Sequence, residues 1–266
     1  MRSRTAWTCL GIATLLFAAC GGDTGDGTTT TSVADTTTTT APTTTSTTSA
    51  PTVTTTTAVT TTTLPAATTT VGEPGDLPGE PIEFGPAAGD TLAVIGVAHD
   101  DVLNLRAAPG ADQQILDGIP PLHDALTALG RTRQLPGSFW IAVDFDGTEG
   151  WVNLRYVGYL GDTTDETAAV VDQFGDAPGA ETMLDLGFIV ADSMASDEPA
   201  SEVVLVVSPT VGDLGEVTYD VIGLGDDALR GVRVHVFAQP IDEGFVLDAV
   251  EVTALCGRGV DEGACV

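Results

Sequence analysis

The side chains that most often carry out catalysis are few in this sequence, and their spacing matches no familiar catalytic arrangement. The three histidines, His99, His123 and His235, do not form the His-Glu-x-x-His motif that holds zinc in metalloproteases. The chain also lacks the Gly-x-Ser-x-Gly and Ser-x-x-Lys motifs of serine hydrolases. Acidic residues are abundant, but no two stand out as the paired carboxylates of a glycosidase. The sequence predicts that the protein is not an enzyme, with a cryptic wall hydrolase as the least favoured alternative.

Two short segments resemble cofactor or metal motifs. Residues 223–228 fit Gly-x-Gly-x-x-Ala, but Asp226 and Asp227 would repel a pyrophosphate and no long helix follows. We interpret this segment as a hairpin turn. Residues 144–149 contain part of a calcium-loop pattern without its remaining oxygen ligands. The sequence therefore predicts no cofactor and no metal site, with weak calcium binding to the acidic surface as the alternative.

The charge of the chain limits its partners. It contains nine arginines, no lysine and 38 aspartates and glutamates, for a formal net charge of −29 at pH 7. A surface this acidic repels phosphate backbones and anionic lipid headgroups. The composition argues against nucleic acid as a partner and against electrostatic docking on a membrane.

The first 20 residues are typical of an export signal. Two arginines precede an apolar run from Ala6 to Ala19, which is too short to span a bilayer of about 30 Å. The run ends in Phe-Ala-Ala-Cys at residues 17–20, which resembles the lipobox of bacterial lipoproteins, with Phe17 in place of the usual Leu. This resemblance implies that Cys20 is acylated and anchors the protein to the outer face of the cytoplasmic membrane. An ordinary secretory signal is the alternative.

Residues 21–82 follow as a Thr-rich tract with scattered Ala, Ser and Pro. The tract has no apolar periodicity, and it cannot bury enough surface to offset the entropy lost on ordering. We expect a disordered linker that projects the folded part into the cell wall.

From about residue 90 the pattern changes to short apolar segments separated by turns. Residues 138–154 alternate apolar and polar side chains around Asp146-Gly147, which predicts a β-hairpin. Several short strands within about 70 residues indicate a small barrel.

Two motifs in this region resemble the signatures of the bacterial SH3-like domain. LNLRAAPG at residues 103–110 is similar to its opening motif, and GWVNLRYV at residues 150–157 to its closing motif. The resemblance covers about residues 88–160, and we assign the domain to residues 83–160. It implies a half-open barrel of five or six strands in a secreted or wall-associated protein. Some members of the family bind peptidoglycan peptides, while many have no known ligand.

Aromatic and arginine side chains of this domain could form a ligand groove, with flat apolar contacts and a guanidinium facing a carboxylate. The candidate groove residues are Trp140, Trp151, Tyr156, Tyr159, Arg106 and Arg155. The alternative is that the tryptophans pack in the barrel and that Arg106 only ties loops together.

Residues 161–266 have a different pattern, with two amphipathic helical segments followed by four strand-like segments. This order predicts a separate α+β domain of no recognised family, with two helices on an antiparallel sheet. Cys256 and Cys265 are the cysteines left after the signal and Cys20, so we expect them to form a disulfide.

The sequence as a whole predicts a membrane-anchored, extracytoplasmic lipoprotein with a non-catalytic SH3-like module that binds cell-wall peptide or an envelope protein. The alternative is a structural or accessory envelope protein whose C-terminal α+β domain performs the recognition.

Overall fold

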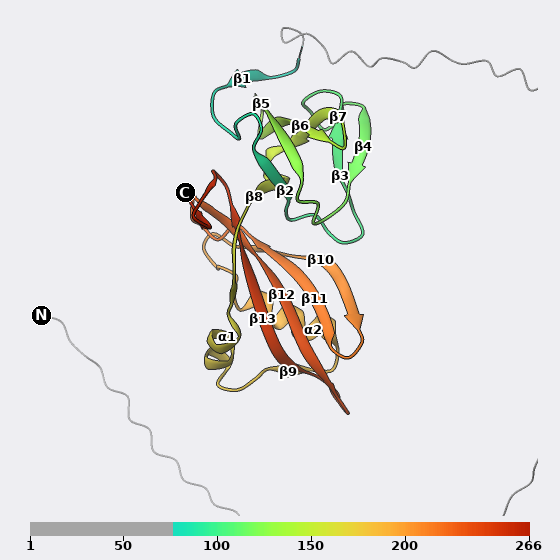
Figure 1. Ribbon diagram of the computed structural model, residues 1–266, viewed down its shortest axis with the longest axis vertical. Coiled ribbons are helices and arrows are strands. Elements are labelled where there is room, and N and C mark those ends of the chain that lie inside the picture. Colours follow the sequence, from blue (N-terminus) through green and yellow to red (C-terminus); the bar gives the residue numbers. More distant parts are fainter. Residues whose placement is uncertain (1–76) are drawn as a thin grey trace, which may run out of the picture. The chain divides into compact units, whose positions relative to one another are not determined.

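The structure is a computed structural model that describes residues 77–266 (Figure 1). The predicted signal peptide, the acylation site Cys20 and residues 21–76 of the predicted linker lie outside the described residues. Within residues 77–266, the structure contains no helix long and apolar enough to cross a membrane.

The N-terminal half is a small β-structure of short antiparallel strands. They are β1 (Glu80–Ile82), β2 (Thr91–Val94), β3 (Leu103–Arg106), β4 (Ile115–Ile119), β5 (Leu126–Leu135), β6 (Ser138–Phe145) and β7 (Thr148–Asn153), followed by the 3-10 turn η1 (Leu154–Tyr156) and β8 (Val157–Asp165). The β6–β7 hairpin turns at Asp146 and Gly147, both with positive φ, as a type I′ hairpin turn requires. Apolar residues that alternate along these strands form the main buried core, which includes Leu105, Ile141 and Val152, and a second, smaller buried cluster contains two tryptophans.

Residues 80–82 were predicted to belong to the linker, but they form β1 and pair with β5. The guanidinium of Arg133 donates hydrogen bonds to the backbone oxygens of Leu77 and Gly79, at 3.2 and 2.8 Å. The segment before the barrel is therefore held through its backbone, by strand pairing and by Arg133. The periodicity of its side chains does not predict such contacts.

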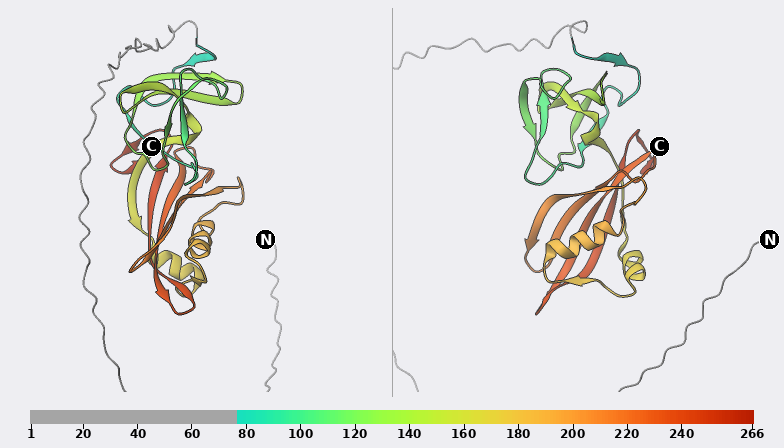
Figure 2. Two further views of the ribbon diagram at one scale, coloured as in Figure 1. Left: turned by 90° about the vertical axis from the view of Figure 1, so that its right-hand side faces the viewer. Right: turned by 180° about the vertical axis from the view of Figure 1, so that it is seen from behind.

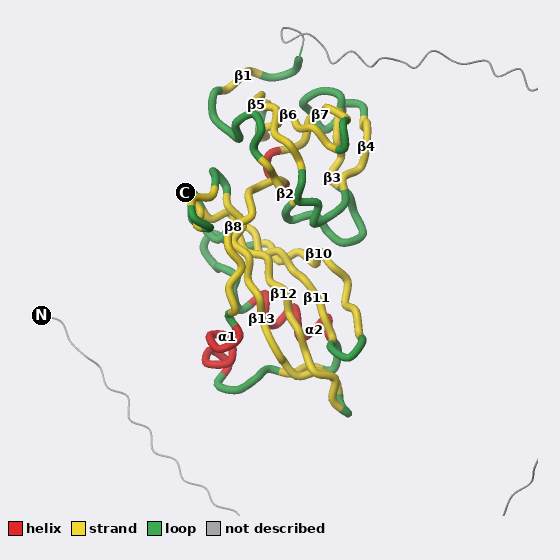
Figure 3. Tube along the Cα trace, in the orientation of Figure 1, coloured by secondary structure: helices red, strands yellow, loops and turns green. Residues whose placement is uncertain are grey.

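The C-terminal half contains the two helices that the sequence predicts, followed by a four-stranded antiparallel meander (Figure 3). Its elements are α1 (Thr167–Phe174), β9 (Gly179–Ala180), α2 (Met183–Asp192), β10 (Glu202–Val211), β11 (Gly215–Ile222), β12 (Leu229–Ile241), β13 (Gly244–Cys256), β14 (Val260–Asp261) and β15 (Ala264–Cys265). Both helices lie on one face of the sheet (Figure 2). Along β12, Val234, Val236 and Ala238 alternate with less buried residues and pack beneath α2.

Helix α2 is adapted to close packing on this sheet. Its N-cap Thr182 accepts a hydrogen bond from the backbone nitrogen of Asp185 at 3.1 Å, which satisfies one of the free donors of the first turn. A Cβ atom on Gly187 would lie 2.3 Å from a methyl carbon of Val217 and 2.9 Å from the ring of Tyr219. The glycine is required because the helix backbone approaches β11 this closely.

The two halves share strand β8. Its first residues, Val157 and Gly158, pair with β2, whereas the segment from Tyr159 to Asp165 pairs with β13. The main sheet is therefore continuous, in the order β10-β11-β12-β13-β8-β2-β5-β6-β7-β3-β4. A separate domain was predicted from residue 161, whereas this position lies inside the shared strand.

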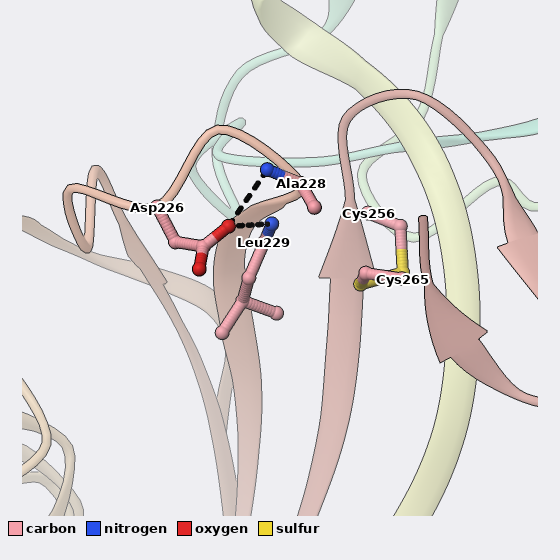
Figure 4. The surroundings of a disulfide bond; sticks show 5 residues. All are labelled: Asp226, Ala228, Leu229, Cys256 and Cys265. Carbon is pink, nitrogen blue, oxygen red and sulfur yellow. Dashed lines mark hydrogen bonds between the residues drawn. A yellow bond between two sulfur atoms is a disulfide. The ribbon is translucent and has the colours of Figure 1, made fainter.

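The predicted disulfide between Cys256 and Cys265 is present (Figure 4), with the two Cα atoms 5.1 Å apart. It closes the small β14–β15 hairpin onto the end of β13. The backbone nitrogen of Asp162 in β8 donates to the oxygen of Gly263 in this hairpin at 2.8 Å. Closing a ring of this size stabilises the folded chain by roughly 2–3 kcal/mol through the entropy of the unfolded state.

Candidate functional site

A cavity of about 470 Å³ lies where the first barrel strands meet β10. This volume is in the range of small-ligand sites. Its lining residues are Gly96, Val97, Ala98, Asp101, Val102, Leu103, Asn104, Arg106, Ala111, Trp140, Asn153, Tyr156, Glu202 and Val204. The lining combines apolar and aromatic surface with several polar groups, a composition suited to a peptide.

One wall of the cavity is the loop between β2 and β3, residues 95–102. The C-terminal sheet holds this loop at two positions. The backbone nitrogen of Gly96 donates to a carboxylate oxygen of Asp220 at 2.8 Å, and that of His99 donates to the oxygen of Leu205 at 2.9 Å. Nδ1 of His99 also lies 2.9 Å from the hydroxyl of Ser208. The loop is therefore fixed in place by strands β10 and β11.

Tyr156 of η1 and the preceding residue Asn153 also line the cavity. Asn153 caps this turn by accepting a hydrogen bond from the backbone nitrogen of Arg155 at 2.9 Å. The guanidinium of Arg155 lies 5.7 Å from the ring centroid of Tyr156 and within 2.7 Å of a carboxylate oxygen of Glu202. Tyr156 presents its half-buried ring to the cavity.

Arg230 of β12 supports the same turn from the other side. Its Nη1 atom donates to the backbone oxygens of Leu154 and Val157, at 2.6 and 2.8 Å. Burial lowers the pKa of this guanidinium from its usual value, but an arginine stays charged in proteins. Together, these bonds fix η1 against the C-terminal sheet.

A buried ion pair connects β11 and β12 to the barrel. Nε and Nη2 of Arg233 donate to the two carboxylate oxygens of Asp220, at 2.8 and 3.0 Å. Nη2 also donates to the backbone oxygen of Val94 at 3.0 Å. The Asp220 side chain is fully buried, and that of Arg233 is 12 % exposed. This network ends at Gly96 and therefore supports the wall of the cavity.

Three of the six predicted groove residues line the cavity. They are Arg106, Trp140 and Tyr156. Nη1 of Arg106 donates to the backbone oxygen of Gln113 at 2.7 Å, so this side chain also ties the loop after β3. The indole nitrogen of Trp140 donates to the hydroxyl of Ser138 at 3.0 Å.

The other three predicted residues have different surroundings. Trp151 is 1 % exposed and packs with Trp140 and Ala142. The hydroxyl of Tyr159 donates to a carboxylate oxygen of Asp90 at 2.6 Å, and burial together with this bond raises the pKa of Tyr159. Arg155 reaches the cavity indirectly, through its ion pair with Glu202.

Sequence reasoning missed two features of this site. The loop at residues 95–102 carries no recognisable binding motif, and Glu202 and Val204 come from β10, about 50 residues beyond the closing motif. Strand pairing alone brings β10 to the cavity, so no local signal in the sequence could have identified them. Among residues 77–266, no cluster of three His, Cys, Asp or Glu side chains is placed to hold a metal ion.

Comparison with known families identifies the family of the barrel. Residues 101–158 match the family model of the bacterial SH3 domain. This segment is a bacterial SH3 domain. The match confirms that the opening and closing motifs are those of this family. The matched segment begins at the end of the 95–102 loop, contains β3–β7 and η1, and ends at the start of β8. The chain matches no curated protein and no solved structure.

Proposed function

We propose that this protein is a non-catalytic binding protein of the cell envelope and that its SH3 domain binds cell-wall peptide in the cavity. The observation that carries the proposal is the cavity itself, which opens on the SH3 domain between the 95–102 loop and η1. Tyr156 supplies a flat apolar surface, Asn104 and Asn153 can exchange hydrogen bonds with peptide groups, and the remaining donors of Arg106 can bind a carboxylate of the ligand. Bacterial SH3 domains often bind cell-wall components, which supports this class of ligand.

Replacing Tyr156 with alanine should weaken binding to purified peptidoglycan by about tenfold or more, because central aromatic contacts dominate interface energies. The measurement is co-sedimentation of residues 21–266 with purified peptidoglycan. Phe139→Ala is the matched control, since Phe139 is an exposed aromatic residue of the same barrel that packs on Phe84 and does not line the cavity.

A second variant separates loss of binding from loss of folding. Ala111 is exposed and lines the cavity, so Ala111→Trp should fill the cavity without removing a packed side chain. We expect it to reduce binding while the circular dichroism spectrum is unchanged. Full binding by both folded variants would show that the cavity is not the wall-binding site.

We further propose that the protein is exported and held by a lipid on Cys20, so that the binding half projects into the cell wall. The support is the lipobox-like sequence Phe-Ala-Ala-Cys that ends the apolar run. Cys20→Ser should abolish lipidation, because a serine hydroxyl does not replace the cysteine thiol in this modification, and the protein should move from the detergent phase to the aqueous phase in phase partitioning. An unchanged mature mass and an unchanged partition for the variant would contradict the anchor.

A further inference from the structure

Residues from two parts of the chain line the cavity, and one of these parts lies beyond residue 158, where the matched SH3 segment ends. Glu202 and Val204 of β10 complete its lining. Glu202 is fixed within the sheet by its pairing with Ile222 of β11. The ligand chemistry of the site is therefore decided partly by a strand outside the SH3 domain.

The charges in this lining favour a cation. Two of the lining residues, Asp101 and Glu202, carry carboxylates, whereas one, Arg106, carries a guanidinium, which already donates to the backbone oxygen of Gln113. The rest of the C-terminal half strengthens this preference, because residues 161–266 contain 3 arginines and 22 aspartates and glutamates. A negative potential of this kind concentrates cationic groups near the cavity and repels anionic ones.

The ion pair with Arg155 leaves Glu202 able to bind a further cation. The two side chains are 62 % and 59 % exposed, and exposed ion pairs contribute little stability. An ionised carboxylate has about four lone-pair sites, and the structure shows Nη2 of Arg155 on only one of its oxygens, Oε2. A ligand ammonium group that joins or displaces Arg155 therefore meets a small energetic cost.

The sheet that fixes the backbone of Glu202 also holds other parts of the cavity lining. The 95–102 loop is held by Asp220 and by the oxygen of Leu205, and η1 is held by Arg230. Because these contacts come from β10, β11 and β12, the sheet that carries Glu202 also holds the loop and the η1 turn that line the cavity. Such preorganisation reduces the entropic cost of binding.

We propose that Glu202 makes this cavity selective for peptides that carry a free ammonium group, and that the C-terminal sheet thereby acts as a specificity element for the SH3 domain. This inference rests on the proposed function, because it names the group on the wall peptide that the cavity recognises. In this arrangement the ammonium group of the peptide contacts Glu202, and a carboxylate of the same peptide is free to meet Arg106.

The test uses residues 21–266 and two samples of purified peptidoglycan, one native and one N-acetylated with acetic anhydride to remove its free amines. We expect acetylation to weaken wild-type binding by about tenfold, the size typical of a hydrogen bond to a charged group. Glu202→Gln should bind native peptidoglycan about tenfold more weakly than wild type and should no longer distinguish the two samples. Glu251→Gln, which removes an exposed carboxylate of β13, is the matched control for the change in net charge and should behave as wild type.

The possible outcomes separate the inference from the function on which it rests. Equal binding of the wild type to both samples would overturn the ammonium selectivity and leave wall binding intact. Continued discrimination by Glu202→Gln, or an equal loss in Glu251→Gln, would assign the effect to another group or to net charge and overturn the role of Glu202. Binding of the wild type to neither sample would overturn both proposals.

Discussion

Replacing Asp220 with asparagine is expected to lower the free energy of unfolding by about 3–5 kcal/mol, because the substitution leaves Arg233 charged and without its carboxylate partner. The Asp220 side chain is fully buried and that of Arg233 is 12 % exposed, so water cannot replace the lost partner. The measurement is urea denaturation followed by circular dichroism, which gives the free energy of unfolding in water. A loss below about 1 kcal/mol would contradict a buried ion pair at this position.

Two further variants identify the source of this effect. Asp248→Asn removes an exposed carboxylate that accepts a hydrogen bond from Gln239, and it should change stability by no more than about 0.5 kcal/mol. The double variant Asp220→Asn with Arg233→Met removes both charges, and it should be more stable than Asp220→Asn alone because no unpaired charge stays buried. With Arg233→Met alone also measured, a double variant that loses as much stability as Asp220→Asn and Arg233→Met added together would show that the two side chains do not interact.

The same ion pair bears on the organisation of the chain, because Arg233 donates to Val94 and Asp220 accepts from Gly96 in the barrel. These bonds, those of Arg230 and the shared strand β8 connect the two halves through buried contacts. We infer that the described part of the chain unfolds as one cooperative unit, and that isolated residues 83–160 would expose unpaired backbone groups at Val94 and Gly96.

Local features of the fold could be read from the sequence with good accuracy. The alternation around Asp146-Gly147 predicts the β6–β7 hairpin, and the apolar spacing after residue 165 predicts both helices. The disulfide follows from counting the cysteines of a chain that is predicted to be exported. For the hairpin and the helices the signal lies within a few residues of the feature that it predicts, and for the disulfide it lies in the cysteine content of the chain.

Long-range features could not be read in this way. The sharing of β8 depends on its pairing with β2 on one side and β13 on the other, and those strands are separated by about 150 residues in the sequence. In the sequence, nothing distinguishes Glu202 from other charged residues at the start of a strand. Its role follows only from the position of β10 beside the cavity. The candidate groove residues were chosen by residue type, and type alone does not distinguish Tyr156, which lines the cavity, from Trp151, which packs in the core.

Trp151 therefore provides a second test with a large expected effect. Its side chain is among the largest that are fully buried, it packs with Trp140 and Ala142, and the guanidinium of Arg131 lies 5.8 Å from its ring centroid. Trp151→Ala should lower the free energy of unfolding by about 3–5 kcal/mol, the usual result of removing a buried tryptophan. Urea denaturation measures the loss, with Phe139→Ala, the exposed aromatic residue of β6, as a control that should lose much less.

Because the alanine variant could unfold, Trp151→Phe decides whether Trp151 acts through packing or through contact with a ligand. A phenyl ring keeps most of the apolar volume, so this variant should fold with a smaller loss of stability, about 1–3 kcal/mol. If Trp151 acts through packing, folded Trp151→Phe binds purified peptidoglycan as tightly as the wild type, whereas folded Tyr156→Ala does not. A tenfold loss of binding in folded Trp151→Phe would instead place Trp151 in contact with the ligand, and the binding surface would then extend from the cavity into the barrel beneath Trp140.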